Sequence, residues 1–274
     1  MQINDFAQVT RRTLLAGSAL LALPARAAGD AASAQLRRLL DASAATEAAL
    51  DPLGEPGALR TPVFVDPLGD SYADRLRADA LRDRAGLAAI DRAALGPVDR
   101  IAHDVLAWRS DQTLALFDSG LFAIQRQLPL SPSSGLHVEL PDFVAGAGAP
   151  FVTLADYEAG LDRLDGFVGH MDMTIVRLRE GLAAGRVQPR IIVDNVLAQV
   201  AAMLALPVTA TPFYAAVTRL PATLPAAARQ RLTDAYRRRI AEAVLPAYAR
   251  WQAFLTETYR PRAGGTGPIG AARW

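Results

Sequence analysis

Apolar residues recur every three or four positions along most of this chain, which is the spacing of one buried face on an α-helix. In the longest pattern, Leu232, Tyr236 and Ile240 begin a stripe that continues for several turns. Pro246 lies within that pattern and predicts a kink just upstream, because proline has no backbone N–H to donate. The spacing predicts helices over 31–50, 73–91, 97–117, 153–181, 189–206 and 225–259.

Proline and glycine interrupt the helical pattern in two long stretches, 51–70 and 119–150, and a shorter linker covers 207–221. Within the second stretch we expect short extended pieces at 122–128 and 136–140. The predicted fold is therefore all-α, a helical bundle of about six helices with one long irregular crossing.

The amino-terminal residues have the pattern of an export signal. Arg11 and Arg12 precede a short apolar run that ends at Pro24, and Ala25 and Ala27 frame an A-x-A cleavage site. The paired arginines favour the twin-arginine route. The run is about half the length needed to span a bilayer, so we predict a signal peptide over 1–27 and no stable membrane span. The mature protein is expected in the periplasm or the medium.

Composition removes several classes of chemistry. The chain has no cysteine, so disulfides and cysteine-ligated metals are excluded. All 29 basic residues are arginine, which excludes Schiff-base lysines, and a net charge of +1 predicts no nucleic-acid partner. The three histidines form no H-E-x-x-H or other paired motif, so the sequence predicts no metal-binding residue, no catalytic residue and no cofactor in this chain.

One histidine lies in a different setting from the other two. His103 and His170 are expected as partly exposed residues on helices, whereas His137 lies in the irregular segment with Gly135 and Glu139. If this segment is extended, His137 and Glu139 project to the same face. Loops of this kind on a helical scaffold often carry substrate contacts, although His137 can equally cap a helix or bridge to a carboxylate.

Several segments in a fixed order resemble the bacterial family called domain of unknown function 885, over about residues 31–262. The resemblance is carried by the segments 135–141, 157–164, 178–181, 188–190, 212–214, 244–248 and 254–261, together with Gly185. That family resembles largely helical zinc metallopeptidases of the gluzincin type, often exported, whose zinc ligands lie in a later H-E-x-x-H helix.

The resemblance implies that residues 28–262 correspond to the amino-terminal half of such a protein and form one wall of a substrate cleft. It leaves open whether the chain alone is an enzyme, with zinc expected only in full-length members. The tail 263–274 departs from the family and suggests a truncation or a frame change. The candidate substrate-orienting residues, for a possible peptide substrate, are Gly135, His137, Glu139, Arg163 and Arg190.

Two alternatives remain beside this exported fragment. One is a non-enzymatic periplasmic protein that binds a peptide or a partner chain. The other is half of a split peptidase whose carboxy-terminal half is encoded separately. If a downstream domain is missing, we expect an exposed apolar surface near Trp251, Phe254 and Leu255.

Overall fold

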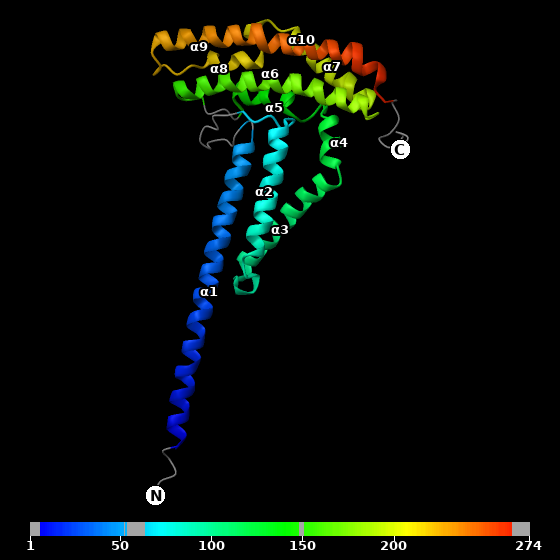
Figure 1. Ribbon diagram of the computed structural model, residues 1–274. Helices are drawn as coiled ribbons and strands as arrows, with labels where there is room; N and C mark the ends of the chain where they lie inside the picture. Colours follow the sequence, from blue (N-terminus) through cyan, green and yellow to red (C-terminus); the bar gives the residue numbers. More distant parts are fainter. Residues whose placement is uncertain (1–5, 52, 54–63, 148–150, 265–274) are drawn as a thin grey trace. The chain divides into compact units, whose positions relative to one another are not determined.

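The computed structural model describes residues 6–51, 53, 64–147 and 151–264, and these residues form helices with no β-strand (Figure 1). The all-α prediction is confirmed, as expected for a chain rich in alanine, leucine and arginine. No described helix is long and apolar enough to cross a membrane. The α-helices are α1 Phe6–Leu50, α2 Asp70–Ala88, α3 Pro97–Asp118, α4 Leu121–Gln127, α5 Leu136–Asp142, α6 Leu154–Ala183, α7 Arg190–Leu204, α8 Ala215–Thr218, α9 Ala226–Arg239 and α10 Leu245–Ala253.

The chain divides into two compact units. The first comprises residues 1–46 and 76–115, and the second comprises residues 47–75 and 116–274. The structure does not describe the side chains of the predicted signal residues Arg11, Arg12, Ala25 and Ala27. Residues 265–274, nearly all of the predicted tail, also lie outside the described residues. The predicted signal, helical domain and tail therefore stay predictions.

The first unit has a small apolar core with a polar network beside it. Leu36, Leu87 and Leu106 are buried together at the centre of that core. Next to it, the Ser43 hydroxyl donates to the buried Asp83 carboxylate at 2.7 Å. A buried carboxylate with hydrogen-bond partners costs far less than an isolated one, so this network adds to the apolar contact between α1 and α2.

The second unit is built around α6, which packs beside α9 and α10 (Figure 1). Three ion pairs join α6 to α9 and α10: Glu158–Arg231, Asp165–Arg239 and Asp172–Arg250. Residue numbers rise together on the two sides of these pairs, so α6 runs parallel to α9 and α10. All three lie at the surface, where such pairs contribute about 0–1 kcal/mol each, so they define register more than stability. Stability comes from a continuous aromatic core that includes Tyr157, Phe167 and Phe213.

A kink is predicted just upstream of Pro246, and the structure has a π-helical turn, Ile240–Val244, at that place between α9 and α10. Pro246 cannot donate to the carbonyl four residues earlier, and a π-helical turn is a common adjustment of a helix. A second π-helical segment, Phe254–Tyr259, follows α10. The predicted last helix is thus correct in extent but not regular throughout.

Two expectations about this unit are wrong. The predicted extended pieces at 122–128 and 136–140 are the helices α4 and α5, each preceded by a glycine with positive φ that lets the chain turn into a helix. The predicted exposed surface near Trp251, Phe254 and Leu255 is also wrong, because all three side chains are buried in the aromatic core.

Candidate functional site

The start of α5 brings together three of the residues that the sequence singled out. Gly135 has φ +97°, and its N–H donates to Glu139 Oε1 at 2.9 Å. His137 Nε2 lies 2.8 Å from the Ser131 carbonyl oxygen, which can only accept, so Nε2 carries the proton. The segment is helical, so His137 and Glu139 do not share a face as they would in a strand.

The middle of α6 forms the opposite wall, with the segment that precedes α2 laid along it. His170 Nδ1 donates to Asp66 Oδ1 at 2.7 Å, and Arg177 Nε donates to the Leu68 carbonyl at 2.9 Å. Further back, the Phe64 ring packs so closely on Gly166 that a Cβ there would overlap it. These contacts fix the course of residues 64–70 along α6.

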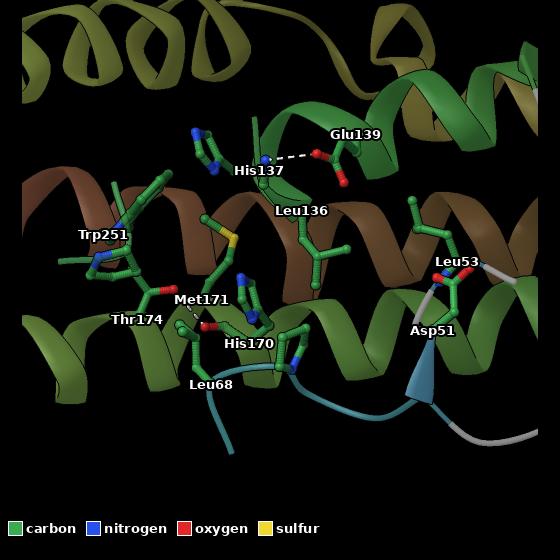
Figure 2. A pocket seen from close by; sticks show the side chains of 13 residues that line it. Asp51, Leu53, Leu68, Leu136, His137, Glu139, His170, Met171, Thr174 and Trp251 are labelled. Atoms are coloured by element: carbon green, nitrogen blue, oxygen red, sulfur yellow. Dashed lines mark hydrogen bonds between the residues drawn. The ribbon is translucent and has the colours of Figure 1, made fainter. Parts of the chain in front are cut away.

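A cavity of about 310 Å³ lies between these walls (Figure 2). The indole of Trp251 and the imidazole of His137 meet edge to face, with ring centroids 5.3 Å apart. Figure 2 shows Trp251 at one side of the group and Asp51 at the other. The lining residues are Asp51, Leu53, Pro67, Leu68, Pro129, Gly135, Leu136, His137, Glu139, His170, Met171, Thr174 and Trp251.

His137 is held neutral in this cavity. Burial lowers its pKa to about 4 from the ordinary 6.5, and the nearby His170 acts in the same direction. The hydrogen bond to the Ser131 carbonyl and the charge of Glu139 oppose the shift only in part. At neutral pH His137 therefore adds no charge to the lining, and no arginine is among the described lining residues.

The described residues that line the cavity combine apolar surface with carboxylate, imidazole and hydroxyl groups. Within the described chain, no cluster of three histidine, aspartate or glutamate side chains is placed to hold a metal ion. Nor does any described hydroxyl hydrogen-bond either imidazole; Thr174 Oγ1 donates instead to the His170 carbonyl at 2.9 Å. The residues present thus do not fit a zinc centre, and no step through zinc follows from them.

Neither Arg163 nor Arg190 is among the described residues that line the cavity. Arg163 is buried on α6, with its guanidinium 5.7 Å from the centre of the Phe143 ring. Burial lowers its pKa, an effect that nearby acidic groups oppose. Arg190 is the first residue of α7, and its backbone N–H donates to the Gly264 carbonyl at 2.9 Å.

Sequence reasoning missed several residues of the site. His170, expected to be partly exposed, is buried and paired with Asp66 across 104 positions of sequence. Asp51 and Trp251 also line the cavity, one from a stretch read as an irregular crossing and the other from a stripe read as core. Only a long-range contact could have revealed these residues, because none belongs to a local motif.

Comparison with known proteins gives a family and a fold. A solved structure of a candidate lipoprotein from Colwellia psychrerythraea is similar at 12% sequence identity and a TM-score of 0.59, with 86% of this chain and 42% of that one covered. The chain thus spans less than half the length of that protein, and the likeness bears on the fold alone. No curated protein matches. The model of the family described as "Bacterial protein of unknown function (DUF885)" matches residues 63–274, so the chain belongs to the DUF885 family.

Proposed function

We propose that this chain is the peptide-binding part of an exported, metallopeptidase-like DUF885 protein, and that the cavity of the second unit receives a peptide segment. The observation that carries the proposal is the cavity itself, to which three residues singled out from sequence, Gly135, His137 and Glu139, all contribute. Its volume lies in the range of sites for small ligands.

The lining suits a peptide because it combines apolar walls with a few polar groups. Leu53, Leu136 and Met171 offer apolar surface to a side chain. Asp51 and Glu139 supply carboxylates, and Thr174 supplies a hydroxyl group.

Export supports the same proposal. The paired Arg11 and Arg12 and the Ala25–Ala27 site are typical of a protein sent to the periplasm or the medium. The similar structure from Colwellia psychrerythraea is described as a candidate lipoprotein, which is compatible with that location.

The direct test fills the cavity from its rim. Leu53→Trp adds a bulky ring at a half-buried lining residue, and Leu197→Trp makes the same change at a half-buried residue of α7 that does not line the cavity. Fluorescence anisotropy with fluorescein-tagged mixed-sequence peptides should show saturable binding to the full chain, weakened at least tenfold by Leu53→Trp only. Equal binding by both variants, with melting curves like that of the parent chain, would overturn the proposal. So would no saturable binding.

A second candidate, docking of a partner chain, is favoured by α3. Val98, Ile101, Val105 and Trp108 are 58–77% exposed and follow the 3–4–3 spacing of a helix-pairing seam. Scattered apolar residues on a surface are ordinary, but four in one stripe mark an interaction surface. Capture of a partner that depends on this stripe, without any peptide binding in the cavity, would favour this alternative.

A further inference from the structure

One ring nitrogen of His137 is bound within the chain and the other is not. Nε2 donates its proton to the Ser131 carbonyl oxygen at 2.8 Å, so the neutral imidazole carries its lone pair at Nδ1. Nδ1 has no hydrogen-bond partner in the described chain. Unlike Nε1 of Trp251, it is not fully enclosed by the protein. Nδ1 is therefore a hydrogen-bond acceptor that remains open to a ligand.

Gly135 leaves this nitrogen uncovered. Gly135 and His137 both line the cavity (Figure 2). A Cβ at residue 135 would lie 3.4 Å from Nδ1 and 3.5 Å from Cε1 of the imidazole. Any larger side chain at residue 135 would thus stand against the edge of the ring that carries the lone pair. With glycine there, a ligand atom can come beside Nδ1.

The imidazole is also held in one orientation. The bond from Nε2 to Ser131 fixes one end of the ring, and the indole of the buried Trp251 meets it edge to face, with the two ring planes at 69°. An acceptor that is already fixed in place loses little conformational freedom when a ligand binds. The open nitrogen of His137 is thus placed to position a ligand.

From these contacts we infer that Nδ1 of His137 accepts a hydrogen bond from a main-chain amide N–H of the bound peptide. The inference rests on the proposed peptide-binding function and names the residue that positions the peptide's main chain. Every residue of a peptide other than proline supplies such an N–H. The lining holds other acceptors, in Asp51, Glu139 and Thr174, so the experiment must separate His137 from them.

The experiment uses acetyl-Leu-Ala-Leu amide, whose side chains carry no hydrogen-bond donor. Three analogues each replace one main-chain N–H by an ester oxygen, which removes the donor and adds no bulk. Isothermal titration calorimetry at pH 7 on the full chain gives the four affinities. We expect one analogue to bind about fivefold more weakly than the all-amide peptide, a loss typical of one neutral hydrogen bond.

His137→Phe keeps an aromatic ring against Trp251 and removes both ring nitrogens. In this variant the same ester analogue and the all-amide peptide should bind equally, because the acceptor is gone. His103→Phe makes the same change on α3, at a histidine that is not among the described lining residues. This matched control should keep the fivefold difference.

A second measurement observes Nδ1 in the parent chain. With ¹⁵N-labelled histidine, the Nδ1 resonance of His137 should move as acetyl-Leu-Ala-Leu amide binds, because a hydrogen bond to the lone pair changes the shielding of that nitrogen. The ester analogue that binds weakly should leave the resonance nearly in place at saturation. The resonance is assigned by its loss in His137→Gln.

The outcomes separate this inference from the proposed function. If all four peptides bind equally and Leu53→Trp abolishes that binding, the role of His137 is wrong and the peptide-binding cavity stands. If none binds saturably, both are overturned. If one ester analogue loses the same affinity in the parent chain and in His137→Phe, another acceptor binds that N–H and the inference fails. An Nδ1 resonance that stays in place when the all-amide peptide saturates the chain contradicts the inference as well.

Discussion

Gly160 and Gly169 lie on the same helix, α6, in opposite environments. A Cβ at Gly160 would overlap the hydroxyl of Tyr236 and come within 2.8 Å of the Phe151 ring, whereas a Cβ at Gly169 would meet nothing within 4 Å. The Tyr236 hydroxyl donates to the Tyr157 carbonyl at 2.9 Å across the α6–α9 contact. Gly160 therefore permits the close approach that this hydrogen bond requires.

We predict that Gly160→Ala lowers the free energy of unfolding by about 1–3 kcal/mol, since the added methyl group overpacks a full core. Gly169→Ala should raise it by about 0.5–1 kcal/mol, because alanine is the better helix former. Urea unfolding followed by circular dichroism measures both. Similar effects of the two substitutions would contradict the packing at Gly160.

The low pKa of His137 makes folding sensitive to acid. The unfolded chain takes up this proton below about pH 6.5, but the folded chain does so only below about 4, so the unfolded state binds more protons in that window. Stability should therefore fall as the pH drops from 6.5 to 4. The full difference corresponds to roughly 3 kcal/mol at 1.36 kcal/mol per pH unit.

The check is urea unfolding at pH 7 and pH 4 for the parent chain and for His137→Gln, which has no titrating imidazole. Other groups titrate in both proteins, so the loss on acidification should be smaller in the variant by up to about 3 kcal/mol. The same loss in both proteins would show that His137 is not held neutral by burial.

At the scale of elements, local signals predicted the long helices from α2 onward well, whereas α1 begins at Phe6 and not at residue 31 as predicted. Thr153 caps α6 through a capping box with Asp156, as its sequence position predicts, and Pro97 begins α3. The short helices α4 and α5 were missed because the many prolines and glycines around them outweigh a pattern of only seven residues. Their helical state depends on packing against α6, which no local pattern encodes.

The sequence predicted part of the site, namely the residues at the start of α5, but not the residues that other segments contribute. Gly135, His137 and Glu139 stood out because they lie together in a stretch without regular helical periodicity. His170 did not, since its partner Asp66 comes from a distant segment and its neighbour in sequence, Asp172, faces Arg250 instead. Burial of a histidine on a long amphipathic helix depends on which segment covers it.

The exposed stripe on α3 leads to a prediction of its own. Replacing Ile101 and Val105 together by arginine should reduce binding of the dye ANS and any self-association, because the stripe is the largest exposed apolar row on one described helix. Stability should change by less than about 1 kcal/mol, since neither side chain is buried. Fluorescence and sedimentation velocity measure these effects.

Ile191 offers the matched control for that experiment. It is exposed on α7, with no apolar row around it, so Ile191→Arg should leave dye binding unchanged. An equal decrease in both variants would contradict a specific apolar surface on α3.

At the scale of the whole molecule, the predicted export signal can be tested directly. Replacing Arg11 and Arg12 by lysine should block export, because the twin-arginine receptor reads the arginine pair as an address. Cell fractionation with an antibody to the mature chain measures the result, and Arg26→Lys serves as the control. Unimpaired export of the double variant would contradict the twin-arginine route but not the presence of a signal.

Methionine methyl NMR tests, residue by residue, whether the cavity of the second unit receives a peptide. Of the four methionines, Met171 lines the cavity and Met203 packs on the same core without lining it. Titration of Leu-Ala-Leu amide into the full chain labelled with ¹³C-methyl methionine should shift the Met171 resonance saturably, with no change at Met203. If the resonances of Met171 and Met203 both stay in place, or if they move together, the peptide does not bind in this cavity.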